Sequence, residues 1–274
     1  MTTLAMPTAK GIPLLGAGTY PLQGDDCYRS VRMALDHGLR HIDTAQMYGN
    51  EKDVGRAIAD AGMSRGEIFV VSKVDPGNMT ASRFAASVAR SVNELGGPPD
   101  LLLIHWPPAE EEFTAVLDRL MAEHRKGNAR AIGVSNFSPA MMRRAQEHCD
   151  GAIVNNQVEF HPLLDQSSVL AAARDLGIAV SAYSPLARGA ALKPHAIAAI
   201  AHRLDRSPSE VVLRWILQQG VVAIPMTTRR ENMLSNIRAL DFELPADDMA
   251  AISAIGTRQG RTINPSWMAG RWEP

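Results

Sequence analysis

Residues 68–73 of the chain read Ile-Phe-Val-Val-Ser-Lys, an apolar run that ends on a lysine. Because no polar residue alternates with the apolar ones, the run is typical of a strand buried on both faces, as in a parallel sheet. Short, mostly apolar runs recur at 14–16, 39–42, 101–104, 131–134, 153–158, 179–182 and 221–224. Helical stripes of apolar residues lie between them. Eight strands that alternate with helices predict an α/β fold of the (β/α)8 TIM barrel class.

The length of 274 residues fits one barrel of ordinary size. No linker, low-complexity stretch or change of composition divides the chain, so we predict a single domain over residues 1–274. We expect an additional helix over 192–203, a last helix near 245–255, and a C-terminal tail that folds over the barrel mouth. Helix-start signals of the Ser-Pro type lie at Ser138-Pro139 and at Ser207-Pro208, the latter with Glu210 in a capping box.

Composition narrows the class of protein. The net charge of -1 gives no reason to expect nucleic acid or an acidic membrane surface as a partner. The N-terminal residues lack the apolar core of a signal peptide, and no stretch is long enough to cross a bilayer. Cys27 and Cys149 match no metal or redox spacing, so we interpret them as reduced thiols. We therefore expect a cytoplasmic protein, and a monomer, since no obvious apolar docking helix is present.

Four polar residues follow the ends of three consecutive predicted strands: Asp43, Tyr48, Lys73 and His105. In a parallel barrel the carboxyl ends of the strands meet at one face, where active sites lie. A free tyrosine loses its proton near pH ~10, and a nearby lysine cation lowers that pKa by favouring the phenolate. Asp43 would hold Lys73 charged and in place. The set predicts a site that can protonate an oxygen at neutral pH.

These residues also indicate a reaction. A carbonyl bound at Tyr48 and His105 would be polarised, and then protonated as a hydride reaches its carbon. His105 could donate a hydrogen bond to the substrate oxygen or help to relay a proton. Side chains cannot supply a hydride, so a cofactor must do so.

The chain resembles the aldo-keto reductase family over essentially its whole length. The motifs that carry the resemblance are Gly-Ala-Gly-Thr-Tyr at 16–20, Asp-Thr-Ala at 43–45 with Tyr-Gly-Asn-Glu at 48–51, Ile-His-Trp-Pro at 104–107, Gly-Val-Ser-Asn-Phe at 133–137 and Asn-Gln-Val-Glu at 156–159. The resemblance implies a tetrad of Asp43, Lys73, His105 and the acid/base Tyr48. It also implies a nicotinamide cofactor extended across the barrel mouth.

The resemblance further implies which residues hold that cofactor. Ser135, Asn136 and Gln157 would hydrogen-bond the carboxamide, and Tyr183 would stack on the nicotinamide ring. The other expected contacts are Gly18, Thr19, Tyr20, Ser184, Pro185, Leu186, Pro225, Thr227, Thr228, Arg229, Asn232 and Asn236. No third glycine follows Gly16 and Gly18 at the spacing of a dinucleotide fingerprint, so we interpret this pair as a tight backbone bend near the nicotinamide.

The segment after the last strand departs from the pattern of many relatives, which carry Ile-Pro-Lys-Ser there and an arginine further on. Here Met226 and Thr227 follow Ile-Pro, and Asn232 stands in place of that arginine. The residues that could replace these 2′-phosphate partners are Thr227, Thr228, Arg229 and Arg230. This run is similar to that of the bacterial 2,5-diketo-gluconate reductase B and methylglyoxal reductase branch of the family, which uses NADPH. An arginine near the ribose suits a phosphate better than a hydroxyl. We predict NADPH, with NADH as the alternative.

Tyr20, Met47 and Trp106, with Trp267 or Trp272 from the tail, are expected to line the substrate pocket. An aromatic and methionine wall suits small aldehydes, ketones or keto-sugars such as methylglyoxal, and the sequence does not choose among them.

Two other functions stay open. A metal-dependent barrel hydrolase could use His41, Asp43 and His105 as ligands, but no ligand pair on a late strand is evident and Lys73 would oppose a cation. We therefore expect no metal. A non-catalytic redox sensor or scaffold could bind nucleotide through the same fold, although all four tetrad positions are filled.

Overall fold

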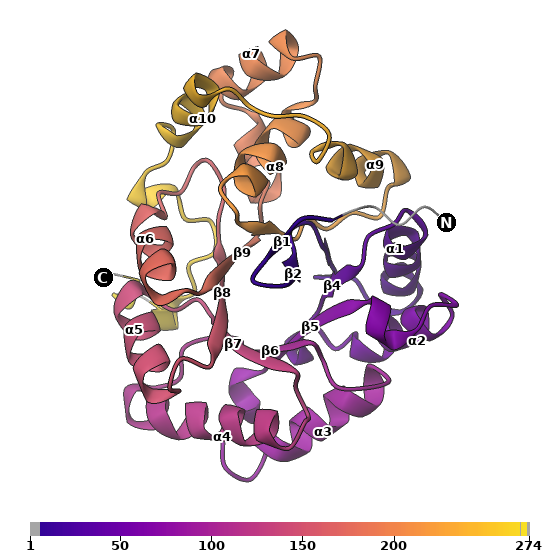
Figure 1. Ribbon diagram of the computed structural model, residues 1–274, viewed down its shortest axis with the longest axis vertical. Coiled ribbons are helices and arrows are strands. Elements are labelled where there is room, and N and C mark those ends of the chain that lie inside the picture. The colour runs from indigo at the N-terminus through magenta and orange to yellow at the C-terminus, as the bar shows by residue number, and fades with distance from the viewer. Residues whose placement is uncertain (1–5, 269, 273–274) are drawn as a thin grey trace.

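The computed structural model describes residues 6–268 and 270–272. At its centre is a sheet of parallel strands whose neighbours follow chain order: β3 (Ala17–Gly18), β4 (His41–Asp43), β5 (Phe69–Val74), β6 (Leu101–Ile104), β7 (Ala131–Ser135), β8 (Ile153–Glu159), β9 (Ala179–Tyr183) and β10 (Val222–Ala223). Figure 1 shows the strands as a ring inside a ring of helices. The predicted (β/α)8 barrel is confirmed.

The ring closes between its first and last strands. The Gly16 amide donates to the Ala223 carbonyl at 2.9 Å, and the Ala223 amide donates to the Leu14 carbonyl at 2.7 Å. At the same seam, a Cβ on Gly18 would lie 2.9 Å from the Ile224 carbonyl oxygen, and one on Gly16 would lie 2.8 Å from the His41 ring. The two glycines therefore permit close packing at the seam. This corrects the interpretation of the pair as a tight bend.

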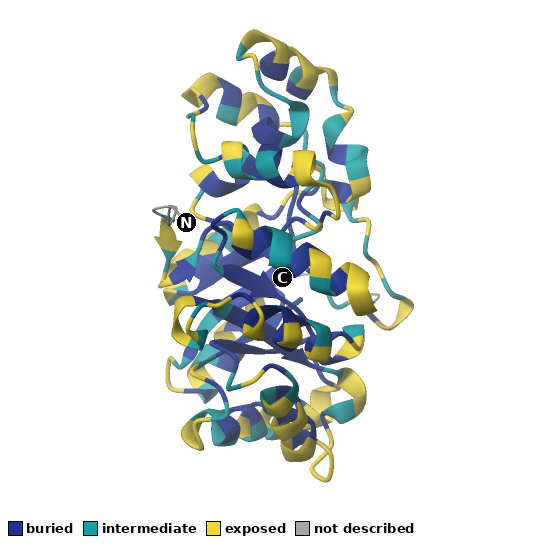
Figure 2. Cartoon of the chain, turned by 90° about the vertical axis from the view of Figure 1, so that its right-hand side faces the viewer, coloured by how far each residue is buried: buried dark blue, intermediate teal, exposed yellow. Residues whose placement is uncertain are grey.

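The helices around the barrel are α1 (Gly24–Asp36), α2 (Glu51–Ala59), α3 (Phe84–Glu94), α4 (Phe113–Arg125), α5 (Pro139–His148), α6 (Ser167–Leu176), α7 (His195–Arg203), α8 (Pro208–Gln218), α9 (Arg230–Arg238) and α10 (Ala246–Ser253). Figure 2 shows their buried residues turned toward the strands and their exposed residues turned outward. Two predicted caps are confirmed: Ser138 accepts a hydrogen bond from the Met141 amide, and Ser207 and Glu210 form a capping box. None of the helices in the described residues is long and apolar enough to span a bilayer.

Several elements differ from the expectation. An antiparallel hairpin of β1 (Thr8–Ala9) and β2 (Ile12–Pro13) precedes the barrel and lies across the centre of the ring in Figure 1. Its two-residue strands are too short to give a periodic signal. Helix α9 was also not predicted; it buries only Met233, Ser235 and Asn236, so its apolar stripe is weak. The expected helix over 192–203 begins at His195, after Pro194 as N-cap. The assignment of the whole chain to one domain stays a prediction.

Candidate active site

A cleft of about 790 Å³ opens at the carboxyl ends of the strands. Most of the residues expected to touch cofactor or substrate line it: Gly18, Thr19, Tyr20, Asp43, Met47, Tyr48, His105, Trp106, Ser135, Asn136, Gln157, Tyr183, Ser184, Pro185, Leu186 and Pro225. They come from the ends of seven different strands or the loops that follow them. The barrel therefore brings together residues that lie as far apart in the sequence as Gly18 and Pro225.

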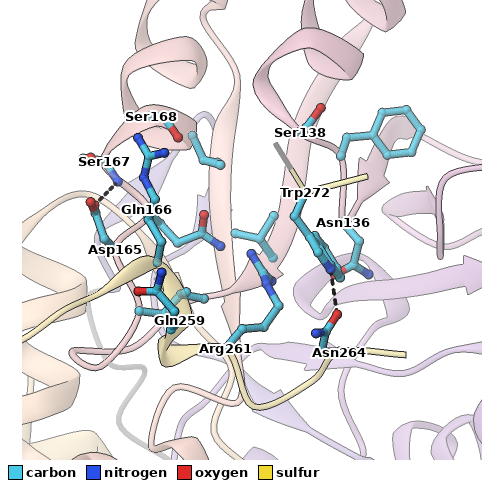
Figure 3. Close-up of a pocket in the computed structure, with 15 residues that line it drawn as sticks. Asn136, Ser138, Asp165, Gln166, Ser167, Ser168, Gln259, Arg261, Asn264 and Trp272 are labelled. Atoms are coloured by element: carbon cyan, nitrogen blue, oxygen red, sulfur yellow. Dashed lines mark hydrogen bonds between the residues drawn. The ribbon is translucent and has the colours of Figure 1, made fainter. Parts of the chain in front are cut away.

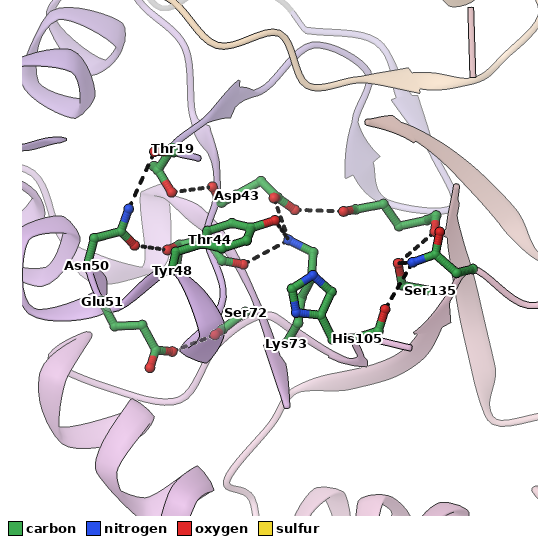
Figure 4. Close-up of polar contacts among 12 residues, drawn as sticks. Thr19, Asp43, Thr44, Tyr48, Asn50, Glu51, Ser72, Lys73, His105 and Ser135 are labelled. Atoms are coloured by element: carbon green, nitrogen blue, oxygen red, sulfur yellow. Dashed lines mark hydrogen bonds and ion pairs between the residues drawn. The ribbon is translucent and has the colours of Figure 1, made fainter. Parts of the chain in front are cut away.

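Lys73 lies behind the cleft wall and is fully buried. Its Nζ donates to the Asp43 Oδ1 at 2.6 Å, to the Thr44 carbonyl at 2.9 Å and to the Tyr48 hydroxyl at 3.4 Å. Figure 4 shows these three partners converging on the ammonium group. All three ammonium protons thus have acceptors, and one acceptor is the phenol that faces the cleft.

Asp43 is held from its other side as well. Its Oδ2 accepts a hydrogen bond from the Gln157 Nε2 at 2.7 Å. The Gln157 carbonyl in turn accepts from the Ser135 hydroxyl at 2.8 Å, and the Asn136 Nδ2 donates to the His105 carbonyl at 3.0 Å. These bonds link β4, β7 and β8 to the loop after β6. The amide nitrogens of Asn136 and Gln157, which were expected at a carboxamide, are already engaged with protein oxygens.

Tyr48 and Lys73 shift each other's pKa in opposite directions. Burial raises the pKa of Tyr48 and outweighs the lowering by Lys73, so the phenol is protonated at neutral pH. A lowered pKa was expected from the lysine alone. That expectation is wrong for the net shift, although Lys73 acts in the predicted direction. Burial alone would lower the pKa of Lys73, but Asp43 and Tyr48 raise it, so the ammonium keeps its charge.

His105 is a neutral imidazole beside this pair. Burial, reinforced by the Lys73 charge, holds the pKa of His105 well below its usual value. Its ring stands edge-on to the Tyr48 ring, with centroids 5.6 Å apart. A neutral imidazole can donate one hydrogen bond without adding a charge, so the cleft offers a protonated phenol and an imidazole side by side.

Comparison with known proteins identifies the family of the chain. The model of the Aldo/keto reductase family matches residues 10–257. Methylglyoxal reductase DkgB of Escherichia coli O157:H7 is 37% identical, covering 96% of this chain and 99% of the relative. The chain belongs to the aldo/keto reductase family.

Solved structures agree with that assignment. A crystal structure described as a putative 2,5-diketo-D-gluconic acid reductase B has a TM-score of 0.94 and 35% identity, covering 98% of both chains. The aldo-keto reductase of Bombyx mori in complex with NADP has a TM-score of 0.90 and 28% identity, covering 99% of both chains. The predicted family and the prediction of an oxidoreductase enzyme are confirmed.

The expected adenosine-end residues of this reductase do not line the cleft. Thr227, Thr228, Arg229 and Asn232 lie at or near the start of α9, and Asn236 is buried further along it. The Thr227 Oγ1 accepts a hydrogen bond from the Arg229 amide at 3.1 Å, as a helix-start side chain does. Thr228, Arg229 and Asn232 are exposed. They form a separate patch beyond Pro225.

Other residues of the cleft were missed by the sequence reasoning. They are Pro21, Arg188, Gly189, Ile224, Met226 and Ile263. Arg188 has a φ of 53° in the turn after β9. The glycine at position 189 was a sequence signal for this turn. Ile263 belongs to the C-terminal tail, and no periodic sequence pattern predicts the contacts of that tail.

Both tail tryptophans of the reductase reach Trp106. The ring centroids of Trp267 and Trp272 lie 6.1 Å and 6.2 Å from that of Trp106, each edge-on. Arg271 donates to the carbonyl of Pro108 at 2.6 Å. The tail therefore packs against Trp106 at the barrel mouth. Neither tail tryptophan lines the cleft itself, as one of them was expected to do, and Trp272 lines a separate cavity.

His41, a ligand in the hydrolase alternative, lies deeper in the barrel. Its Nδ1 is 3.0 Å from the Pro13 carbonyl oxygen, and its ring contacts Phe69 edge-on. Among residues 6–268 and 270–272, no group of three His, Cys, Asp or Glu side chains is arranged to hold a metal ion.

Proposed function

We propose that this reductase uses NADPH to reduce the carbonyl group of a small aldehyde, ketone or keto-sugar to an alcohol, with Tyr48 as the proton donor. The observation that carries the proposal is the Tyr48 hydroxyl on the cleft wall, 3.4 Å from a Lys73 ammonium that Asp43 holds at 2.6 Å. Relatives named methylglyoxal reductase and 2,5-diketo-D-gluconic acid reductase B support the substrate class.

The cleft fits a nicotinamide dinucleotide. Its volume of about 790 Å³ is in the range of cofactor sites, and it is lined by three tyrosines and a tryptophan, several amide and hydroxyl groups and one arginine. Tyr183 and Asn136 would hold the nicotinamide end, and the Arg188 guanidinium would attract the negative pyrophosphate. When bound, the nicotinamide supplies the hydride that goes to the carbonyl carbon.

The chain's own residues manage the proton. Tyr48 donates its hydroxyl proton to the carbonyl oxygen, and the hydride and the proton together convert the carbonyl to the alcohol. Lys73 stabilises the phenolate that remains, and Asp43 keeps Lys73 charged throughout. Neutral His105 donates a hydrogen bond to the carbonyl oxygen as negative charge develops on it.

We assign the patch at the start of α9 to the adenosine end of the cofactor. Arg229 and Arg230 are exposed there, beside Thr227 and Thr228. Arginine suits the planar, bidentate recognition of a phosphate. This assignment favours NADPH over NADH. The cytoplasmic location and the monomeric state stay predictions.

The test is turnover by purified protein with NADPH and a panel of carbonyl compounds that includes methylglyoxal. The variant Tyr48→Phe should lose about 10²- to 10⁴-fold in kcat while its NADPH affinity, measured by fluorescence titration, survives. A kcat within a few-fold of wild type would remove Tyr48 as proton donor. NADPH binding by wild type without turnover of any carbonyl would support the non-catalytic sensor or scaffold instead.

A further inference from the structure

The C-terminal residues 257–268 and 270–272, here called the strap, extend from the loop after β8 to the mouth of the cleft. Its start is fixed by backbone bonds: the Thr257 amide donates to the Leu163 carbonyl at 3.1 Å, and the Asp165 amide donates to the Thr257 carbonyl at 3.1 Å. Its end lies against Trp106 through Trp267 and Trp272. The contacts that hold the middle of the strap therefore determine the position of its two tryptophans against Trp106.

Glu159 fixes the middle. This carboxylate is fully buried at the end of β8. It accepts hydrogen bonds from the Thr262 amide at 2.8 Å and the Ile263 amide at 3.1 Å, and also from the Thr262 hydroxyl. The His161 Nε2 lies 3.0 Å from the Glu159 Oε1 and is a fourth polar partner. The Thr262 and His161 partners are at Oε1 and the Ile263 amide is at Oε2, so both carboxylate oxygens are engaged.

The charge state agrees with this geometry. Burial alone would raise the pKa of Glu159, but the hydrogen bonds from His161, Thr262 and Ile263 together lower it below its ordinary value. The carboxylate is thus ionised at neutral pH, and its bonds to the strap are charge-assisted.

Arg261 extends the contact to the aromatic end. Its Nη1 lies 3.7 Å from the Glu159 Oε2, and its guanidinium carbon lies 3.8 Å from the centroid of the Trp272 ring. The Trp272 Nε1 donates to the Asn264 Oδ1 at 2.9 Å. Figure 3 shows Arg261, Trp272 and Asn264 near one another among the residues that line a smaller cavity. The guanidinium is therefore held between a carboxylate and an indole face, both of which attract it.

We propose that Glu159 is a positioning residue that sets substrate selectivity. It fixes the cleft residue Ile263 directly and, through Arg261, fixes Trp272 against the cleft residue Trp106, and so holds in place the part of the cleft here called the aromatic wall (Trp106 with Trp272 packed on it, and Ile263). The inference rests on the proposed function for the presence of a carbonyl substrate. Among the described residues the rings packed on Tyr48 are those of Tyr20 and His105, not those of the tail, so the tail residues should contribute equally to binding substrate and transition state. Loss of such an interaction raises KM and leaves kcat unchanged.

The experiment compares Glu159→Gln with a matched control, Glu123→Gln. Glu123 is also a buried glutamate, and it accepts from the Lys126 Nζ and the Asn128 Nδ2, both at 2.7 Å, on α4 and outside the cleft. The glutamine side chain keeps the size of glutamate but removes its charge, and it puts an NH₂ in place of one of the two oxygens that now accept from the strap amides. Each variant is assayed with NADPH against benzaldehyde and methylglyoxal, and its near-UV circular dichroism is recorded.

For Glu159→Gln we expect the KM for benzaldehyde to rise about 2- to 12-fold, the fold-change that loss of one aromatic contact gives. The KM for methylglyoxal, which is too small to reach the wall, should rise less. The kcat and the NADPH affinity should stay within about two-fold, and the near-UV signal of the tryptophan cluster should change. Glu123→Gln should leave both KM values and the near-UV signal as in wild type.

Two results would overturn the proposal: a Glu159→Gln protein with wild-type KM values and spectrum, or one that loses kcat and NADPH affinity in step with KM. If that variant does not fold, Arg261→Met removes the link to Trp272 and leaves Glu159 its other partners. It should give the same KM pattern, and wild-type KM values would count against the link. Failure of wild type to reduce any carbonyl would refute the proposed function alone, because the near-UV signal still reports on the strap.

Discussion

Replacing Asp43 by asparagine is the sharpest test of how the Lys73 ammonium is held. The lysine is fully buried, Asp43 is 2% exposed, and the Asp43 carboxylate is the charged group among the acceptors that Lys73 contacts. Asparagine has nearly the same shape. If the Gln157 amide turns over, the new side chain can still accept from Lys73 and donate to Gln157, so the change removes the charge and few hydrogen bonds.

Removing one partner of a buried ion pair costs about 3–5 kcal/mol, because the other charge is left uncompensated. In Asp43→Asn the loss of unfolding free energy has an upper limit, because Lys73 can release its proton and become neutral. An unfolded lysine has a pKa of about 10.4, so keeping it neutral at pH 7 costs about 3.4 pH units at 1.36 kcal/mol each, or about 4.6 kcal/mol. We therefore expect the free energy of unfolding to fall by about 3–5 kcal/mol at pH 7.

The pH dependence identifies the cause. In wild type the pKa of Lys73 is raised, so its contribution to stability is complete below about pH 10.4 and is lost only at higher pH. In Asp43→Asn the lysine pKa should fall below 10.4, so the unfolded chain binds more protons and stability rises with pH up to about 10.4. The difference between the two proteins should therefore shrink between pH ~7 and pH ~10.

Urea unfolding at both pH values measures this difference, with Asp100→Asn as control. Asp100 lies 2.8 Å from Arg65 and 2.8 Å from Arg130, and arginine does not titrate in this range. The free energy of unfolding that Asp100→Asn loses should thus be the same at pH ~7 and at pH ~10. A loss in Asp43→Asn that is equally independent of pH, or one below about 1 kcal/mol at pH ~7, would refute the reasoning.

Three further predictions concern the cofactor, the imidazole and the assembly state. Arg229→Ala should weaken NADPH binding more than NADH binding in fluorescence titrations, with Arg230→Ala measured beside it; equal losses for the two cofactors would remove Arg229 from the phosphate site. His105 stays neutral in the fold, so the free energy of unfolding should decrease as the pH falls below about 6.5, and His105→Gln should make that slope shallower. Equal slopes would contradict a neutral His105. Sedimentation should give a monomer at assay concentration, and a stable dimer would disprove that prediction.

The barrel and the polar groups at its mouth could be predicted from local sequence. An apolar run ends where its strand leaves the core, so a polar residue just past the run marks the carboxyl edge of the sheet. Asp43, Lys73 and His105 carry that signal, and the structure brings all three together with Tyr48. The order of the strands follows from the right-handed crossovers that the alternating pattern requires.

The electrostatic balance could not be predicted, because it depends on burial. Sequence alone gave the sign of the Lys73 effect on Tyr48, but the net direction depends on how far the phenol is withdrawn from water. Gln157 shows the same limit. Its amide could serve a bound cofactor or a protein carboxylate, and only the register of β8 beside β7 brings it to the Asp43 Oδ2.

Strand β8 shows why the contacts that anchor the tail could not be predicted. Residues two apart in a strand face the same side, so Asn155, Gln157 and Glu159 form one polar column where an apolar one was expected. Such a column is costly unless each member is hydrogen-bonded. Asn155 donates to the Ser181 hydroxyl, Gln157 to Asp43, and Glu159 accepts from the strap. One strand thus supports the proton donor at one position and the aromatic wall two residues later. Because each has its own polar partner, a change at Glu159 can alter selectivity while the chemistry at Tyr48 is left intact.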